Sequence, residues 1–250
     1  MTSSAARPTV VIVHGAWTDA SSFTDVQQIL SEEGYDVLAF ANPLRSLAGD
    51  ADYLTTFLET RTSGPVILVG HSYGGALIGA AALKVPTVRG LVYVNAFVPD
   101  TGESLLDLLN SAGPVDPTQL FEMVPYPAAP EGDVDLYIKR GPFEPAFATG
   151  LSPQLQAEFY AKQRPITFAA VSAPAAADQA WTQLPSWYVA GTADGSIPLD
   201  LQLRMAHRAA STVTEVDAGH LSMVTQARTV AKIITEAADS TEVAHQAPGH

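Results

Sequence analysis

Short apolar runs alternate with helical patterns along the first hundred residues, and this alternation constrains the fold more than any other feature. Residues 9–13, 35–40, 66–69 and 91–94 are short runs of mostly apolar residues, which are typical of buried strands. Strands that are apolar on both faces belong to parallel sheets covered by helices on each side. The sequence therefore predicts an α/β protein.

The segments between these strands have helical periodicity. In residues 23–33, Phe23, Val26 and Leu30 recur at helical spacing, and Gly34 is a plausible C-terminal stop. Residues 49–61 and 73–83 are the next two predicted helices.

The alternation stops near Pro99 and resumes near residue 185. Residues 100–184 hold many prolines, scattered aromatic residues and no clean apolar strand; 105–109 and 155–159 resemble short helices. Strands are predicted again at 187–190 and 213–216, and helices at 199–209 and 224–237. We interpret residues 1–99 and 185–240 as one core, 100–184 as a mainly helical cap insertion, and 241–250, after Ser240, as a frayed tail.

Composition excludes several classes of function. The 250 residues carry 26 acidic and 13 basic side chains, a net charge of −13, which argues against nucleic-acid partners and anionic membrane surfaces. The absence of cysteine excludes disulfides, thiolate zinc sites and a cysteine nucleophile. No run approaches the ~18 apolar residues of a transmembrane helix, and the N-terminus lacks a signal-peptide pattern. We expect a soluble, cytoplasmic protein.

The strongest chemical signal is Gly70-His71-Ser72-Tyr73-Gly74, which matches G-x-S-x-G between a predicted strand and a predicted helix. A serine on such a sharp turn is exposed as a nucleophile, and the glycines let neighbouring chains pass closely. The alternative is a glycine-rich turn that only packs. The strand-and-helix context favours Ser72 as the nucleophile.

A second signal, His14-Gly15-Ala16-Trp17, directly follows the first predicted strand. Acyl transfer needs two N–H donors where the tetrahedral oxyanion forms. The natural pair is the backbone N–H groups of Ala16 and Tyr73. Alternatively, this segment is a simple strand-end turn in which Trp17 belongs to the core.

A serine nucleophile requires a general base, which is normally a histidine. His220 follows the last predicted strand and precedes the last predicted helix, so it can reach back toward Ser72. The other histidines are weaker candidates. His14 lies in the turn after the first strand, and His71 lies in the turn that carries Ser72, the nucleophile elbow, where we expect its ring to point away from the site. His207 lies in a predicted helix, and His245 and His250 lie in the tail.

The base requires an acid that fixes its tautomer. Asp194 follows a predicted strand and precedes a helix, which places it at the same sheet edge as Ser72 and His220. The chain order serine, aspartate, histidine is the order known for G-x-S-x-G enzymes. Asp100 and Asp217 are the rival acids, and Asp217 is expected to be a solvated strand-end carboxylate.

These residues resemble the α/β-hydrolase superfamily over residues 9 to about 237. The run Tyr93-Val94-Asn95-Ala96-Phe97-Val98-Pro99, followed by Gly102-Glu103-Ser104, resembles a subgroup of small bacterial esterase-like hydrolases, plant methyl-ester esterases and plant hydroxynitrile lyases. The resemblance implies an α/β-hydrolase fold with about six mostly parallel strands and helices on both faces. It also implies Ser72, Asp194 and His220 as catalytic residues, and Ala16 and Tyr73 as oxyanion donors.

The lyase branch carries threonine after the first-strand histidine and lysine after the catalytic histidine. This chain has Gly15 and Leu221 at those positions, which favours an esterase. A serine where some relatives have aspartate argues against dehalogenase and epoxide hydrolase chemistry.

The cap would cover the catalytic edge, and most of its aromatic residues would join it to the core. We predict that Trp17, Phe121, Tyr126 and Phe147 line an apolar substrate pocket. No motif indicates a metal, nucleotide or other cofactor.

The sequence thus predicts a cofactor-free serine hydrolase that cleaves small, fairly apolar carboxylic esters or lactones. A homodimer is possible. The alternatives are a relative that uses the same triad for perhydrolysis or carbon–carbon cleavage, and a small-molecule-binding module with slow turnover.

Overall fold

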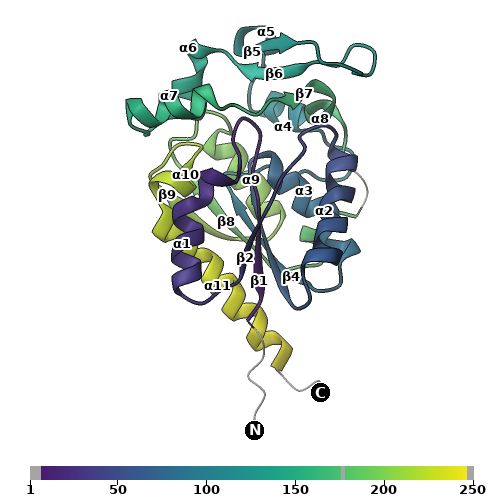
Figure 1. The fold of residues 1–250 in the computed structure, drawn as a ribbon, viewed down its shortest axis with the longest axis vertical. Coiled ribbons are helices and arrows are strands. Elements are labelled where there is room, and N and C mark those ends of the chain that lie inside the picture. The colour runs from purple at the N-terminus through teal and green to yellow at the C-terminus, as the bar shows by residue number, and fades with distance from the viewer. Residues whose placement is uncertain (1–6, 176–177, 247–250) are drawn as a thin grey trace.

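A computed structural model, which describes residues 7–175 and 178–246, contains a six-stranded parallel sheet in the order β2-β1-β3-β4-β8-β9 (Figure 1). The predicted α/β class and the six strands are confirmed. The strands are β1 (Thr9–Val13), β2 (Val37–Phe40), β3 (Val66–His71), β4 (Val88–Val94), β8 (Ser186–Gly191) and β9 (Thr212–Val216).

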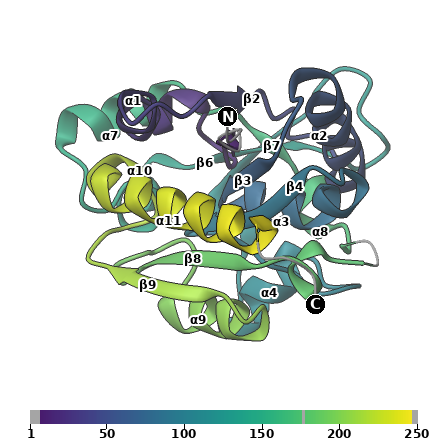
Figure 2. The same cartoon turned by 90° about the horizontal axis from the view of Figure 1, so that it is seen from below.

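Helices cover both faces of the sheet. Figure 2 shows α1 and α11 on one face and α2, α3 and α9 on the other, and each group packs on its own buried apolar cluster. The helices of the core are η1 (Ala20–Phe23), α1 (Thr24–Glu32), α2 (Leu47–Arg61), α3 (Tyr73–Ala81), η2 (Ala82–Lys84), α9 (Leu199–Arg208), α10 (Ser222–Thr225) and α11 (Ala227–Gln246).

The strand order reverses direction between β1 and β3. After β1 the chain moves outward to β2 and then returns to the other side of β1 to form β3. In open α/β sheets, ligands bind beyond the carboxyl ends of the strands at such a switch point. The turn that begins with His14 follows β1, and Ser72 follows β3, so both predicted signals lie at this position.

The chain between β4 and β8 lies over the carboxyl ends of the strands, at the top of Figure 1. Short helices make up most of its regular structure, but it also contains an antiparallel sheet in the order β5-β6-β7, which the sequence did not predict. These strands have only two to four residues, and three of the four residues of β5 are exposed, so they leave no apolar run in the sequence. The elements are α4 (Leu105–Ala112), α5 (Pro117–Leu120), β5 (Phe121–Val124), β6 (Asp135–Ile138), α6 (Arg140–Pro142), the π-helical turn η3 (Phe143–Phe147), α7 (Pro153–Ala161), β7 (Ile166–Thr167), α8 (Phe168–Ser172) and η4 (Ala180–Thr182).

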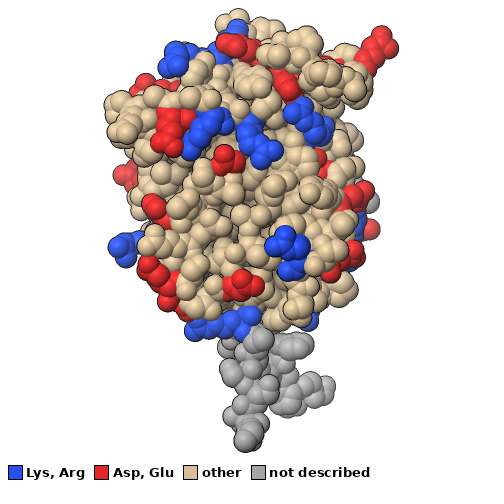
Figure 3. Space-filling model, in the orientation of Figure 1, with Lys and Arg blue, Asp and Glu red and all other residues tan. Residues whose placement is uncertain are grey.

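The last helix, α11, continues to Gln246 and so includes the first residues of the predicted frayed tail. Residues 247–250 of the predicted tail lie outside the described residues. In the part of the chain that the structure describes, none of the helices combines the length and apolar character needed to span a bilayer. On the face seen in Figure 3, basic and acidic side chains are interspersed over a largely uncharged surface.

Candidate functional site at the carboxyl edge of the sheet

Ser72 occupies a sharp turn between β3 and α3. Its backbone has φ 51° and ψ −121°, and its side chain is almost fully buried. A non-glycine residue in such a conformation costs roughly 1–3 kcal/mol and persists only where the surroundings impose it. Strand β3 and helix α3 hold both sides of this turn, so the serine is placed by the core of the fold.

The glycines of the motif allow this turn to pack closely. A Cβ atom on Gly70 would lie 2.7 Å from the Gly74 carbonyl oxygen, and one on Gly74 would lie 2.2 Å from the Val13 carbonyl oxygen. Both separations are shorter than any side chain tolerates. Because Gly74 lies against the end of β1, these close approaches fix the elbow relative to the neighbouring turn at His14.

His220 and Asp194 form a fully buried pair. Nδ1 of His220 lies 2.9 Å from Oδ2 of Asp194, and both side chains are inaccessible to solvent. Because the carboxylate is the acceptor, the proton of the neutral imidazole belongs on Nδ1, and Nε2 carries the lone pair. Nε2 is buried and has no hydrogen-bond partner among the described residues.

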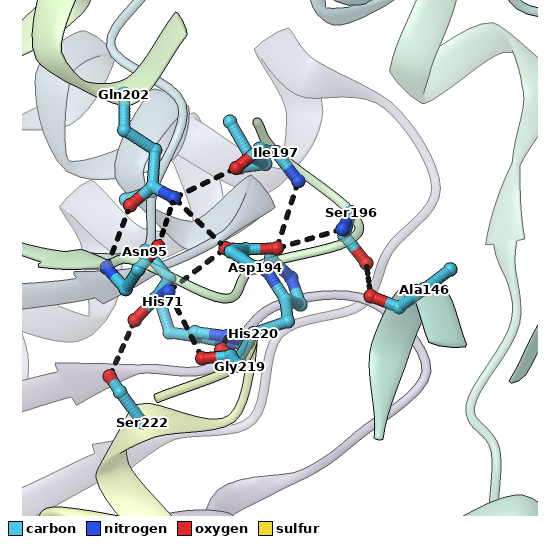
Figure 4. A network of polar contacts seen from close by, with 12 residues as sticks. His71, Asn95, Ala146, Asp194, Ser196, Ile197, Gln202, Gly219, His220 and Ser222 are labelled. Carbon is cyan, nitrogen blue, oxygen red and sulfur yellow. Dashed lines mark hydrogen bonds and ion pairs between the residues drawn. The ribbon is translucent and has the colours of Figure 1, made fainter. Parts of the chain in front are cut away.

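The carboxylate of Asp194 is surrounded by donors (Figure 4). Its Oδ1 accepts from the backbone N–H groups of Ser196 (2.8 Å) and Ile197 (2.9 Å). Its Oδ2 accepts from the side-chain amides of Asn95 (2.9 Å) and Gln202 (3.3 Å), as well as from His220. This set of donors holds the acid in one orientation toward the imidazole.

Asn95 joins the acid to the loop that carries His220. Its amide also donates to the carbonyl of Gly219 (3.2 Å), and its side-chain oxygen accepts from the hydroxyl of Ser222. Asn95 is fully buried with φ 45°, a region that asparagine tolerates better than most residues. A Cβ atom on Gly191 would lie 2.3 Å from the side-chain amide nitrogen of Asn95, so the absence of a side chain at Gly191 provides the space for Asn95.

The turn after β1 is organised by His14. Its Nε2 accepts from the backbone N–H of Asn42 (3.1 Å), so Nδ1 carries the proton and donates to the carbonyl of Gly15 (2.8 Å). Burial lowers the pKa of His14 to about 4, which keeps the ring neutral. Holding the Gly15 carbonyl also orients the Ala16 N–H, because the two groups of a trans peptide point in opposite directions.

The backbone N–H groups of Ala16 and Tyr73 have no acceptor among the described residues, although both residues are buried. Tyr73 is the first residue of α3, where helix geometry leaves the N–H unpaired and the helix dipole favours negative charge. Both residues line the same cavity as Ser72 and His220. Two unpaired amides that belong to residues lining one cavity with Ser72 suit a developing oxyanion.

This cavity has a volume of about 290 Å³ and lies between the sheet edge and the cap. Residues of α4, the segment after it, β5, β6 and α8 form its cap side. No charged residue lines the cavity in the described part of the chain, and its walls are almost entirely aliphatic and aromatic. The polar groups of Ser72 and His220 are therefore placed in an apolar enclosure.

Two of the four predicted pocket residues line this cavity. Trp17 and Phe121 do so, with their rings stacked at 5.3 Å. Tyr126 does not, because its hydroxyl donates to Asp133 (2.7 Å) and its ring packs under Arg45. Phe147 is fully buried and does not line the cavity. Its ring lies edge-on to that of Trp17 at 5.9 Å, and 5.4 Å from the ring of His220.

The carboxylate that binds His220 is that of Asp194 and not that of either rival acid. Asp217 is exposed, as expected of a solvated strand-end carboxylate. Asp100 accepts from the N–H of Thr101 in the segment that leads into the cap. The ring of His71 does not line the cavity; it lies 4.8 Å from the ring of His220, with Nε2 3.0 Å from the His220 carbonyl oxygen.

Sequence reasoning missed two residues of this network, Asn95 and Gln202. Asn95 carried a usable signal, because it is a polar residue directly after an apolar strand, at the edge where Asp194 also lies. Gln202 lies within α9, where a lone glutamine gives no signal. Within the described residues, no three histidine or carboxylate side chains converge in a way that could hold a metal ion.

Comparison with known proteins finds a family model that matches most of the chain and relatives that match part of it. The sequence model of the "Alpha/beta hydrolase family" matches residues 10–233. A carbendazim hydrolyzing esterase from Nocardioides sp. (strain SG-4G) is 37% identical over 123 residues, 44% of this chain and 51% of that protein. An alpha-hydroxynitrile lyase from Arabidopsis thaliana is 34% identical over 104 residues, 36% of this chain and 40% of that protein. The matches thus span about half the length of these relatives or less.

Solved structures share the fold over nearly the whole chain. The crystal structure of polyneuridine aldehyde esterase superposes with a TM-score of 0.77, covering 92% of this chain and 99% of that one at 21% identity. At this identity the likeness shows a shared fold and nothing about the chemistry.

Proposed function

This chain belongs to the alpha/beta hydrolase family, and on that premise we propose that it is a serine esterase that cleaves neutral, apolar carboxylic esters or lactones. Ser72 is the nucleophile, His220 the general base and Asp194 the acid that orients it. Ala16 and Tyr73 provide the oxyanion hole through their backbone N–H groups.

The arrangement around His220 carries this proposal. Asp194 fixes the proton on Nδ1, so Nε2 is the basic nitrogen, and it is buried without another partner among the described residues. Ser72 and His220 line one cavity, and Ser72 is held on a strained elbow. A buried, unpaired imidazole nitrogen is costly for stability and suits a group that takes a proton from a substrate-facing hydroxyl.

The reaction then proceeds in two halves. Oγ of Ser72 attacks the carbonyl carbon while its proton moves to Nε2 of His220, and the two amides stabilise the resulting oxyanion. The carbon–oxygen bond to the alcohol breaks as Nε2 returns the proton to the leaving oxygen. Water repeats the sequence on the acyl-enzyme: its proton goes to Nε2, its oxygen bonds the carbonyl carbon, and Ser72 leaves with the proton.

The cavity supports a neutral, apolar substrate. Binding a carboxylate or an ammonium group there would bury an unpaired charge, because no charged side chain in the described lining could pair with it. The apolar walls of α4 and β6 instead favour alkyl and aryl groups.

Gly15 supports an esterase over a cyanohydrin lyase. A Cβ atom at this position would lie 2.7 Å from Cβ of Ser72 and 2.9 Å from the carbonyl oxygen of His71. The threonine that the lyase branch carries there would therefore displace the serine in this backbone arrangement.

The test is active-site labelling combined with ester hydrolysis. A fluorophosphonate should label Ser72 alone, and the enzyme should hydrolyse p-nitrophenyl butanoate with an initial burst. Ser72→Ala should abolish labelling, burst and turnover.

Ser196→Ala is the matched control, because Ser196 lines the same cavity but its hydroxyl donates to the Ala146 carbonyl. The Ser196→Ala variant should still be labelled at Ser72. Labelling of another serine, or turnover in Ser72→Ala, would contradict the mechanism. Labelling without turnover on any ester or lactone would favour a binding module.

A further inference from the structure

Trp17 is held in a conformation that its residue type disfavours. It directly follows Ala16, and its φ of 58° lies in the left-handed region, where a bulky residue is an outlier. Such strain persists only where the surroundings over-determine it, and it concentrates at functional sites.

Both N–H groups of Trp17 are bound by the cap. The backbone N–H donates to the carbonyl of Arg164 (2.9 Å), and the indole Nε1–H donates to the carbonyl of Leu136 on β6 (2.8 Å). The ring lies between Phe121, stacked at 5.3 Å, and Phe147, edge-on at 5.9 Å. Two cap segments therefore fix the residue that follows the Ala16 amide.

A second connection reaches the other side of the same amide. Nη2 of Arg164 donates to the carbonyl of Asn42 (3.1 Å), and the backbone N–H of Asn42 holds the ring of His14. His14 in turn holds the carbonyl of Gly15. The Ala16 N–H belongs to the Gly15–Ala16 peptide group, and both this group and the next one, Ala16–Trp17, are connected to the cap through hydrogen bonds.

From these contacts we infer that Trp17 is a positioning residue, which transmits the seating of the cap to the oxyanion hole through its indole N–H. The inference rests on the proposed function, because it assigns a role to the Ala16 amide in stabilising an oxyanion. A correctly seated cap aims this amide at the position where negative charge develops. The effect appears in the transition state more than in substrate binding, so it separates kcat from KM.

The experiment compares two identical substitutions. Trp17→Phe removes the indole N–H and keeps an aromatic ring. Trp181→Phe is the matched control. The indole N–H of Trp181 also donates to a backbone carbonyl, that of Pro99 (3.0 Å), but Trp181 lies at the stem of the cap and does not line the cavity.

Each variant is assayed with p-nitrophenyl butanoate and with two inhibitors of equal chain length. One is a trifluoromethyl ketone, which forms a tetrahedral adduct with the serine, and the other is a primary alcohol, which binds without one.

Trp17→Phe should lower kcat about 10- to 100-fold, less than the 10²–10³ that loss of a whole oxyanion donor costs, because the amide is displaced rather than removed. The affinity for the trifluoromethyl ketone should fall by a similar factor, whereas the affinity for the alcohol should change by less than about threefold. Trp181→Phe should change neither kcat nor the ratio of the two affinities beyond about twofold.

Arg164→Met provides a second variant, because it breaks the connection through Asn42 and leaves the Arg164 carbonyl in place. It should show the same selective loss of ketone affinity with a smaller factor. An equal fall of ketone and alcohol affinity in Trp17→Phe, or equal losses in Trp17→Phe and Trp181→Phe, would overturn the inference. Failure of the proposed function is distinguishable, since it would appear as an inactive, unlabelled wild-type protein.

Discussion

Three residues of the site adopt left-handed backbone conformations, which are uncommon for residues other than glycine. Ser72, Asn95 and Trp17 all have positive φ. Ser72 and Asn95 directly follow β3 and β4, and Trp17 lies in the turn after β1. These positions are held from two sides, by the sheet below and by a helix or the cap above. Strain of this kind marks places where the fold imposes geometry on a functional group.

Asp194→Asn tests the role of the buried acid. The amide should leave the fold intact but present a donor to Nδ1 of His220, which favours the wrong imidazole tautomer. The analogous change in a serine protease costs about 10⁴ in kcat, so we expect a loss on the order of 10²–10⁴ in ester hydrolysis. Asp217→Asn is the control, because Asp217 is exposed three residues before His220, and it should cost less than about threefold. Steady-state kinetics with circular dichroism decide the matter; near-normal activity in Asp194→Asn would remove Asp194 from the mechanism.

The sequence was sufficient to predict that Ser72, Asp194 and His220 lie at one edge of the sheet. Ser72 directly follows β3, Asp194 and His220 lie a few residues after β8 and β9, and the carboxyl ends of parallel strands meet at one edge. The sequence was not sufficient to predict where Tyr126 and Phe147 lie relative to the cavity. Their positions depend on how the short cap segments fold back, and these segments have no periodicity that reports direction. Aromatic content indicated an apolar enclosure but not which rings face it.

At the scale of elements, helix α9 braces the loop that carries the acid. Gln202 is fully buried, and its side chain bonds to the N–H and the carbonyl of Gly191 (3.2 Å each) and to the carbonyl of Ile197 (2.8 Å). It also donates to Asp194 (3.3 Å). One side chain therefore connects the end of β8, the loop and the start of α9.

Gln202→Leu should destabilise the protein and reduce activity together. Two buried backbone groups, the Gly191 N–H and the Ile197 carbonyl, lose their partner at about 1–3 kcal/mol each, whereas the Gly191 carbonyl keeps the N–H of Asp194. The free energy of unfolding should therefore fall by about 3 kcal/mol. This corresponds to roughly 10 °C in Tm for a chain of this size. Because the acid loop loosens, kcat should also fall about tenfold. Gln28→Leu, on the exposed face of α1, should change neither quantity measurably. Thermal unfolding and ester kinetics on both variants test this; an unchanged Tm in Gln202→Leu would show that water or other groups replace the side chain.

The core elements could be predicted closely, and the cap could not. Strand β1 and the end of β4 match their apolar runs, because buried parallel strands are continuously apolar. The start of β4 was missed, since Val88, Arg89 and Gly90 do not form an apolar run. The sheet β5-β6-β7 was missed because its strands are too short to show an alternation.

At the scale of the whole molecule, two buried neutral histidines connect the site to acid stability. Burial lowers the pKa of His14 from 6.5 to about 4, and burial together with the nearby His220 lowers the pKa of His71 well below 6.5. In the unfolded chain both rings protonate near pH 6.5, whereas in the folded protein they stay neutral until lower pH. Between these values the unfolded state binds more protons, so stability is complete above pH 6.5 and is lost as the pH falls.

The expected loss is large enough to measure. For His14 alone, a shift of about 2.5 pKa units corresponds to about 3 kcal/mol once the pH has fallen to 4, and His71 adds a further loss over a range extending to lower pH. Asp50, whose pKa is raised by burial, acts in the opposite direction near pH 4, so the interval from pH 7 to 5 is the most informative. Urea unfolding at steps of half a pH unit should show the free energy of unfolding falling throughout this interval.

His14→Gln should be less stable at pH 7, because it disturbs the bonds to Asn42 and Gly15, but its stability should fall less steeply as the pH is lowered. His207→Gln, which alters an exposed histidine on α9, should keep the wild-type slope. A free energy of unfolding that does not change with pH in the wild type would show that His14 does not govern the loss of stability at acidic pH. Equal slopes of this free energy in His14→Gln and His207→Gln would show the same.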